Sequence, residues 1–319
     1  MSDLFYRQRL ENEQSRTFYD EICRQIRQDN ISGTYELCVC RSDRAMEDGF
    51  AAIEAVSLDH PEWFFLGRKT TACQEGNRLI LHNQILYTPR QTRRIRVQLN
   101  RVLERLTRGM VGLSEWERER LIYERVVRCM RYENRDVDHD HNVVGPVLTG
   151  KGVCEGFSCL LMLALRKVGI PCIRVSGFGR KELHCWNMAW IGGTPVHLDC
   201  TWESRQEGNI GYFYFNLTDA QIRKDHEIHT KGLPVCDDPS YGYFHQTDTV
   251  FPNAAAASRH IRRAFFSGKP VTWVKLLSDE DMQSCINRGV QWVPGASYSY
   301  VYDQPRNAAM ILRQSFFRR

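Results

Sequence analysis

The chain has 319 residues and a formal net charge of +5, with 42% hydrophobic and 25% charged residues. This is the composition of an ordinary folded protein, so a largely disordered chain is excluded, and the length exceeds that of a typical single domain. Basic and acidic residues are interleaved along most of the chain, so no long-range field of one sign is expected.

The first part of the chain, residues 1–110, is predicted to be an N-terminal α/β region. Apolar residues at helical or alternating spacing identify its elements, and the His60-Pro61 step should end the second helical segment. In chain order, we expect one or two amphipathic helices at 4–27, a strand at 35–40, a helix at 44–58, a hairpin of 69–73 with 78–87, and a helix at 92–106.

Arginines are concentrated near the end of this region. They are Arg90, Arg93, Arg94, Arg96, Arg101, Arg105 and Arg108. Such a run could form a basic helix face that meets phosphate or an acidic partner, but charge runs are usually solvated faces. Nucleic acid is therefore not expected as a partner.

The sequence shows neither the pattern of a signal peptide nor that of a membrane-spanning segment. The N-terminal residues are polar and amphipathic, without an apolar segment typical of a signal peptide, and no window approaches 18 consecutive apolar residues. We expect a cytoplasmic protein without a membrane anchor. Its 12 cysteines are then better interpreted as reduced thiols than as disulfides.

The middle of the chain, residues 111–250, carries the candidate chemistry. Ser114 and Glu117 form a capping box that should open a helix running to about Tyr132. We then expect a helix at 154–168 that ends at Gly169, strands at 172–177, 184–190 and 195–202, and a short helix capped within Asn216-Leu-Thr-Asp. The C-terminal extension, residues 251–319, is predicted to be a small α/β region with a helix at 254–266, a strand at 271–277 and a helix at 279–288.

Cys154 is placed where a cysteine becomes nucleophilic. It follows Gly150 and Gly152 and begins a predicted helix, where the aligned backbone dipoles favour a thiolate. Taken alone, any one of the 12 cysteines could equally be a buried structural thiol.

A predicted hairpin brings a histidine and a carboxylate together. A two-residue turn at Gly192-Gly193 pairs His184 with Thr201 and Asp199 with Trp186, which makes His184 and Asp199 diagonal neighbours on one face. A carboxylate bound to an imidazole N–H fixes the ring's tautomer and orientation. The other face, with Cys185, should project away from this site and pack against a helix.

These motifs, in order, resemble a known family. Gly-Val-Cys154-Glu-Gly, His184-x-Trp-Asn and His197-Leu-Asp199-x-Thr-Trp are similar to the core motifs of bacterial transglutaminase-like proteins of the papain-like cysteine protease superfamily. The similarity extends from about residue 115 to residue 245, including the segment 226–234. It implies an α+β fold, with a nucleophile helix packed on an antiparallel sheet, and a catalytic triad of Cys154, His184 and Asp199.

The resemblance also marks neighbours of the site. The backbone N–H of Cys154 should donate to an oxyanion, and relatives take a second donor from a side chain upstream, for which Asn142, His141 and Tyr132 are candidates. Trp186 should line the acyl-binding groove or pack beneath His184. Glu155 stands where animal transglutaminases have tryptophan, and without an acidic calcium-binding cluster we expect no calcium dependence.

The sequence contains no strong metal-binding or cofactor-binding motif. His139-Asp140-His141 contains good ligands, but a strand or solvated loop explains it without metal, and no dinucleotide or phosphate-binding glycine motif occurs. We expect neither a metal nor a cofactor.

Two hypotheses about function follow. The first is an enzyme that forms an acyl-enzyme on Cys154 from a peptide or side-chain amide, as a protease, deamidase or transglutaminase. The second is a transglutaminase-like binding or scaffolding module without turnover, against which the intact triad argues. The sequence does not choose the substrate, the acyl acceptor or the oligomeric state.

Overall fold

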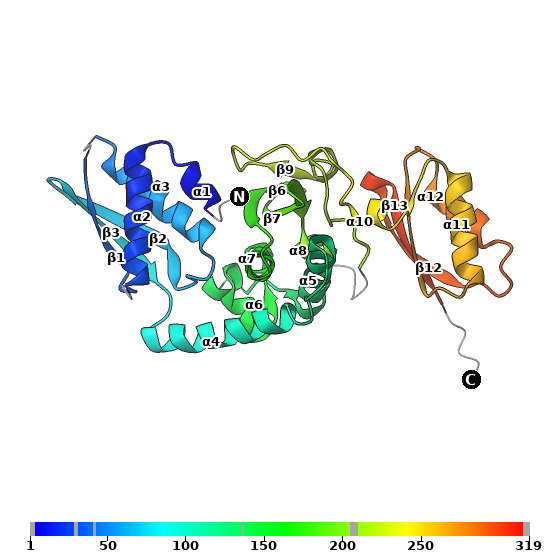
Figure 1. Cartoon of the computed structure of the whole chain (residues 1–319), viewed down its shortest axis with the longest axis horizontal. Coiled ribbons are helices and arrows are strands. Elements are labelled where there is room, and N and C mark those ends of the chain that lie inside the picture. Colours follow the sequence, from blue (N-terminus) through cyan, green and yellow to red (C-terminus); the bar gives the residue numbers. More distant parts are fainter. Residues whose placement is uncertain (1–3, 29–30, 41–42, 136, 205–209, 315–319) are drawn as a thin grey trace.

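The computed structural model describes residues 4–28, 31–40, 43–135, 137–204 and 210–314. Buried apolar side chains form three clusters, the cores of three units that follow one another along the long axis (Figure 1). We call them the N-terminal unit (4–88), the central unit (89–249) and the C-terminal unit (250–314). Residues 315–319 of the predicted C-terminal extension lie outside the described residues.

The N-terminal unit is a three-stranded antiparallel sheet with helices packed on it. Its elements are α1 (Phe5–Gln8), α2 (Glu13–Arg27), β1 (Thr34–Cys38), α3 (Ala45–Asp59), β2 (Leu66–Glu75) and β3 (Arg78–Ile85). The strand order is β1-β3-β2. The predicted hairpin is present, but β2 begins earlier than expected, and its pairing with β3 shifts register between Leu66 and Thr70.

Local chemistry explains the ends of these helices. The side chain of Asn12 accepts the N–H of Ser15 at 2.9 Å, and the Ser15 hydroxyl accepts the N–H of Asn12, so a capping box opens α2. At the far side of the unit, α3 ends at Asp59, as the His60-Pro61 step predicts.

The central unit begins with helices. They and the short elements between them are α4 (Pro89–Leu106), α5 (Glu115–Cys129), β4 (Arg131–Tyr132), η1 (Asp138–His141), α6 (Val144–Thr149), β5 (Lys151–Gly152) and α7 (Cys154–Lys167). The capping box of Ser114 and Glu117 is confirmed. Helix α5 stops before Tyr132, because Met130 is extended and the chain continues into β4, which pairs with β5. Helix α4 packs against α6 and α7.

The sheet of the central unit is antiparallel, in the order β8-β7-β6-β9. Its strands are β6 (Cys172–Gly179), β7 (Glu182–Ile191), β8 (Thr194–Leu198) and β9 (His226–Ile228). The predicted hairpin register is confirmed where the strands pair, since Met188 lies opposite His197. Both turn glycines, Gly192 and Gly193, have positive φ, as a primed two-residue turn requires.

One strand prediction is wrong. Strand β8 ends at Leu198, and the chain turns into a short helix, α8 (Cys200–Glu203), instead of continuing to Trp202. The side chain of Asp199 accepts the N–H groups of Thr201 and Trp202, at 2.8 and 3.1 Å, and so caps this helix. Two further short helices, α9 (Asp219–Ile222) and α10 (Tyr243–Gln246), lead to the C-terminal unit.

The C-terminal unit packs two helices on one face of a four-stranded sheet, in the order β10-β11-β13-β12. Its elements are β10 (Val250–Phe251), α11 (Ala254–Phe266), β11 (Val271–Leu276), α12 (Met282–Val290), β12 (Tyr298–Asp303), η2 (Gln304–Arg306) and β13 (Ala308–Arg313). The hairpin of β12 and β13 is absent from our sequence prediction. The other face of the sheet contacts the central core through side chains such as Trp273, Val301 and Met310.

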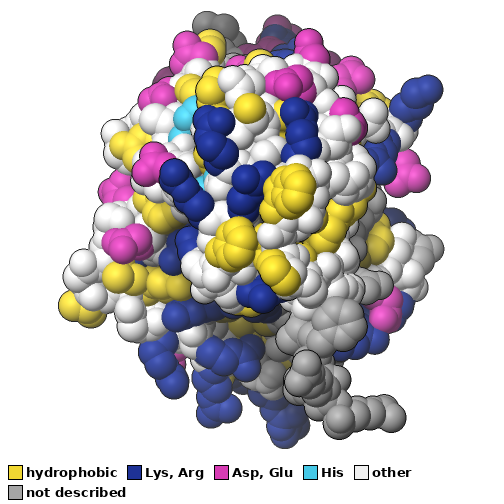
Figure 2. Space-filling model, turned by 90° about the vertical axis from the view of Figure 1, so that its right-hand side faces the viewer, with side chains coloured by type: hydrophobic (Ala, Val, Ile, Leu, Met, Phe, Trp, Pro, Cys, Tyr) yellow, Lys and Arg dark blue, Asp and Glu magenta, His cyan; other side chains and the backbone are white. Residues whose placement is uncertain are grey.

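The outer end of the C-terminal unit is solvated. Figure 2 shows Lys and Arg side chains mixed with apolar ones on this face. In this unit, Phe266 and Trp292 are 62% and 68% exposed. No helix among the described residues combines the length and the apolar character needed to cross a bilayer.

Candidate active site

Cys154 is the first residue of α7 and is half-buried. The preceding residue, Val153, provides no side-chain cap. No capping side chain therefore accepts the N–H groups at the N-terminus of α7. Close packing holds this end in place, because a Cβ at Gly152 or Gly156 would lie about 3 Å from the carbonyl oxygen of Asp140. The helix dipole therefore favours a thiolate at a rigidly held position.

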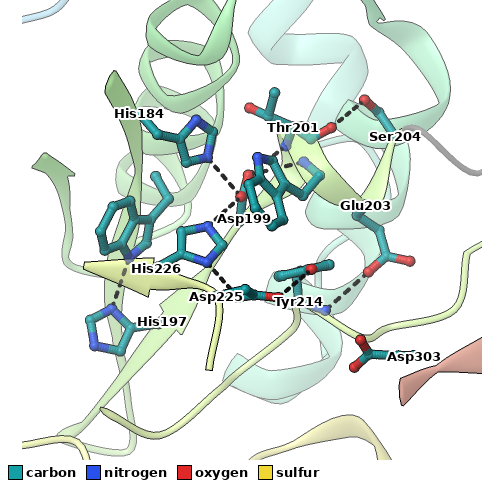
Figure 3. A network of polar contacts seen from close by, with 12 residues as sticks. His184, His197, Asp199, Thr201, Glu203, Ser204, Tyr214, Asp225, His226 and Asp303 are labelled. Atoms are coloured by element: carbon teal, nitrogen blue, oxygen red, sulfur yellow. Dashed lines mark hydrogen bonds and ion pairs between the residues drawn. The ribbon is translucent and has the colours of Figure 1, made fainter. Parts of the chain in front are cut away.

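The histidine and the aspartate meet at the end of the β7–β8 hairpin. His184 Nε2 donates to Asp199 Oδ2 at 2.8 Å, and both side chains are buried (Figure 3). This bond occupies Nε2, which leaves Nδ1 for the sulfur of Cys154. The carboxylate thus fixes the ring's tautomer and orientation.

The electrostatics of the three groups favour an ion pair. Hydrogen bonds from Cys185 and His184 outweigh burial and lower the pKa of Cys154 to about 5. Burial opposes a charge on His184, but the charge and hydrogen bond of Asp199, together with those of Cys154, outweigh burial and raise the pKa of the imidazole to about 10. The pKa of Asp199 is lowered, because two histidines offset its burial. Near neutral pH, a thiolate faces an imidazolium.

Cys185 contradicts our expectation that it projects away from the site. Its face of β7 packs against a helix as predicted, but that helix is α7 itself. The Cys185 sulfur lies 3.4 Å from the hydroxyl of Ser158, one turn after Cys154, and it hydrogen-bonds with the Cys154 sulfur. The prediction failed because Cys185 and its neighbour His184, although they alternate along β7, both reach Cys154 at the start of α7.

Trp186 lies beneath the histidine and is 1% exposed. Its ring stacks on that of His184, with centroids 6.0 Å apart and an interplanar angle of 19°. The indole N–H donates to His197 Nδ1 at 3.0 Å, and His197 Nε2 donates to Asp219 at 2.9 Å. Trp186 therefore serves as a packed floor for His184 and has little surface to offer a groove.

The upstream neighbours lie on the other side of Cys154. Glu155 binds Nδ1 of His141. Asn142 accepts the N–H of Val144 at 2.8 Å and donates to the carbonyl of Asp138 at 3.3 Å. Tyr132, in β4, is 47% exposed. Because the polar groups of Asn142 bind backbone in the described residues, its role as oxyanion donor stays a prediction.

A cavity of about 460 Å³ opens beside these residues, between the N-terminal and central units. Its lining includes Trp63, Phe64, Arg174, His141, Asn142 and Glu155. The residue after the nucleophile thus borders a space large enough for several side chains of a ligand.

Comparison with known proteins bears on this arrangement. Residues 102–200 match the family model described as the transglutaminase-like superfamily. The chain contains a transglutaminase-like domain. No curated protein matches the sequence.

Solved structures resemble the domain at low identity. One is described as "Crystal structure of a TGase", at 13% identity and a TM-score of 0.32, and covers 42% of this chain and 44% of its own. Another is described as "a Putative Cysteine Protease from Cytophaga hutchinsonii", at 13% identity and a TM-score of 0.29, covering 42% of this chain and 61% of its own. The matches thus span less than two thirds of either structure.

The central unit contains a second histidine that our sequence analysis left without a role. His226, at the start of β9, lies 3.2 Å from Asp199 Oδ2 and 2.7 Å from Asp225 Oδ1 (Figure 3). The dipeptide Asp225-His226, which follows the capped helix α9, was the available signal. Sequence alone did not show that the chain returns here to the catalytic carboxylate.

Two groups of side chains in the described residues have ligand-type atoms within 4.8 Å of one another. They are His184 with Asp199 and His226, and His197 with Asp219 and Cys236. In the first group, hydrogen bonds between the same side chains engage the imidazoles and the carboxylate. In the second, Trp186 and Asp219 engage both nitrogens of His197. We therefore assign neither of these two groups to a metal.

A glycine in β6 makes room for the triad. A Cβ at Gly179 would lie 2.6 Å from Trp202 and 3.3 Å from His184, so both rings would have to move. We expect Gly179→Ala to lower the free energy of unfolding by about 1–3 kcal/mol and to raise the pH at which Cys154 becomes reactive. Chemical denaturation and alkylation of Cys154 would measure these effects. The control is Leu183→Ala, beside His184 but 82% exposed, for which neither quantity should change.

Proposed function

We propose that the transglutaminase-like domain is a cysteine-dependent acyl-transfer enzyme that acts on peptide or side-chain amide bonds of a protein or peptide substrate. The observation that carries the proposal is the buried bond of 2.8 Å between His184 and Asp199, together with the hydrogen bond of the same ring with Cys154. A buried imidazole held in one tautomer beside a thiol at a helix N-terminus is the arrangement that activates a nucleophilic cysteine.

The first half-reaction follows from these positions. The Cys154 thiolate attacks the amide carbonyl carbon, and the carbonyl oxygen becomes an oxyanion, to which the backbone N–H of Cys154 can donate. The imidazolium of His184 then gives its proton to the leaving nitrogen. The C–N bond breaks, an amine or ammonia departs, and the acyl group remains as a thioester on Cys154.

The second half-reaction reverses the direction of the proton. His184, now neutral, takes a proton from water or from an acceptor amine, which attacks the thioester carbonyl. Collapse releases the Cys154 thiolate and regenerates the imidazolium. Water yields hydrolysis or deamidation, and an amine yields a new amide, so the acceptor decides between a hydrolase and a transglutaminase. Asp199 stays ionised throughout and stabilises the imidazolium.

The test uses acceptors of both kinds. The protein is incubated with glutamine-containing proteins and peptides, with or without a fluorescent primary amine, and ammonia, peptide cleavage and amine incorporation are followed. We expect at least one product, formed through an acyl adduct on Cys154 that mass spectrometry detects. Cys154→Ala should reduce product to the uncatalysed level.

The matched control is Cys73→Ala, because this cysteine is exposed in β2 of the N-terminal unit. It should keep the activity of the unchanged protein. Product that persists in Cys154→Ala would contradict the proposal. If no substrate forms an adduct and Cys154 also alkylates no faster than an ordinary thiol, the interpretation as a binding module is favoured instead.

A further inference from the structure

A row of charges of alternating sign continues past the triad. Asp199 Oδ2 contacts both His184 Nε2 and His226 Nε2, and His226 Nδ1 contacts Asp225 Oδ1 at 2.7 Å (Figure 3). Because both partners of His226 are carboxylates, which only accept, both ring nitrogens must carry a proton. His226 is therefore an imidazolium held between two carboxylates.

The next member of the row comes from the C-terminal unit. Arg306, in η2, donates to both oxygens of Asp225, at 2.7 and 3.1 Å, from 81 residues along the chain. Its guanidinium lies 4.4 Å from the ring centroid of Tyr214, whose hydroxyl also donates to Asp225 at 2.8 Å. Asp303 accepts from Arg306 Nη1 at 3.1 Å, and the same nitrogen also donates to Asp225. Arg306 is only 4% exposed.

We propose that Arg306 and His226 are positioning residues of the active site: Arg306 holds Asp225, Asp225 orients His226, and His226 fixes Asp199 toward His184. The proposal rests on the proposed function for the role of Cys154. On this view, the C-terminal unit is part of the catalytic apparatus and acts through Asp225.

The surroundings of His226 explain why its position matters. The ionisable and aromatic groups that face it are Asp199 after β8, Asp225 before β9, His184 and Trp186 of β7, His197 of β8, Trp202 of α8, Tyr214 and, through Asp225, Arg306. Burial opposes a charge on His226, but the two carboxylates outweigh it and raise the pKa of the ring.

Two cations share one oxygen at this point. The rings of His184 and His226 lie 5.3 Å apart, so their positive charges repel, and Asp199, which contacts both rings, offsets this repulsion only when it is well placed. Displacement of Asp199 would therefore destabilise the imidazolium of His184 and, through it, the Cys154 thiolate. An arginine that fixes Asp225 with two bonds limits that displacement.

The test removes the charge of Arg306 and follows the pH profile of Cys154 alkylation by iodoacetamide. For Arg306→Met, we expect the acid midpoint to rise by about one pH unit, at the low end of the effect of a nearby charge. Arg306→Lys keeps the charge but loses the two-pronged contact, and its midpoint should lie between those of the unchanged protein and Arg306→Met.

The matched control is Asp303→Asn, which alters the other carboxylate bound to Arg306 and leaves both bonds of Arg306 to Asp225 in place. Its midpoint should stay that of the unchanged protein. An unchanged midpoint in folded Arg306→Met would overturn the proposal, and so would an equal rise in Asp303→Asn, which would indicate general loosening. If Arg306→Met does not fold, Arg306→Lys decides by the same criterion.

A second readout does not depend on the reactivity of Cys154. In spectra of ¹⁵N-labelled protein at pH 7, His226 should show a proton on each ring nitrogen, and the Nδ1 proton should exchange faster with water in Arg306→Met. Absence of the doubly protonated ring in the unchanged protein would overturn the proposal. A cysteine without low-pH reactivity, together with an intact His226 signal, would instead count against the proposed function alone.

Discussion

Replacement of His184 by alanine should slow alkylation of Cys154 at pH 6 by about tenfold and should reverse this order above about pH 7. In the unchanged protein, the pKa of Cys154 is lowered to about 5 by its hydrogen bonds with Cys185 and His184, so nearly all of it is thiolate at pH 6. Without the imidazolium, the midpoint should rise toward about 8.5, the value of a free thiol, which is the upper limit because the bond with Cys185 remains.

The size of the effect combines two opposing terms. A rise in pKa from about 5 to about 8.5 lowers the thiolate fraction at pH 6 by about 300-fold, while the more basic thiolate is about 30-fold more nucleophilic. For the full rise, the net loss is about tenfold at pH 6, and the variant becomes the faster one above about pH 7, where its higher nucleophilicity offsets its smaller thiolate fraction. This reversal separates the loss of an ion pair from simple loss of access, which slows the reaction at every pH.

The sign of the pH dependence follows from the two shifts. The thiolate exists above the pKa of Cys154, about 5, and the imidazolium exists below the pKa of His184, about 10, so the ion pair persists between these values. Peptide mass spectrometry gives the rate at each cysteine, and the exposed Cys73 is the internal reference. Equal profiles for Cys154 and Cys73 in the unchanged protein would mean that the pair is not assembled.

Glu203→Ala should lower the free energy of unfolding of the central unit by about 3–5 kcal/mol. Glu203 is fully buried in α8, and its carboxylate accepts three backbone N–H groups, those of Gly211, Tyr212 and Tyr214, at 2.7 to 3.1 Å. The hydroxyl of Tyr123 also donates to it, at 3.2 Å. Alanine would leave these buried donors without an acceptor.

The measurement must report on the central unit, because a chain of three units need not unfold in one step. Hydrogen exchange of residues 210–216 during denaturant titration provides this. Glu203→Gln, which retains one acceptor oxygen, should lose less stability than Glu203→Ala. Glu227→Ala is the control, because its side chain is 70% exposed, and its stability should be unchanged. Equal stability of Glu203→Ala and Glu227→Ala would refute the assigned role.

The same residue gives a pH dependence of defined sign. Burial raises the pKa of Glu203 to about 7, since it outweighs the bonds from backbone and Tyr123. A carboxyl group with a raised pKa in the folded state binds its proton more tightly there than in the unfolded chain. Its contribution to stability is therefore complete below about pH 4.5 and is lost as the pH rises through about 7. The non-titrating Glu203→Gln should lack this loss.

Sequence patterns predicted the parts of the fold that depend on neighbouring residues. The Gly192-Gly193 turn fixes the hairpin register, because only a primed turn suits two glycines between strands, and Met188 indeed pairs with His197. The capping box of Ser114 and Glu117 and the Pro61 step likewise act within a few residues. These features need no knowledge of the remaining chain.

The missed features depend on distant contacts or on competition between local ones. Asp199 was predicted to be a strand residue, but its side chain accepts the N–H groups of Thr201 and Trp202 and caps α8. The Arg306–Asp225 contact joins residues 81 positions apart, and no periodicity within either segment indicates it. Cys185 was placed by strand alternation alone, which ignores how a helix end meets the edge of a sheet.

Asp199 holds His184 and also caps α8. A substitution there would remove the carboxylate that holds His184 and loosen the helix in one step, so few replacements should be tolerated in evolution even where the proposed catalysis has been lost. Cys154 carries no such structural duty as a helix cap. In descendants that abandon turnover, we expect the cysteine to drift first, while Asp199 persists as a remnant of the site maintained by folding alone.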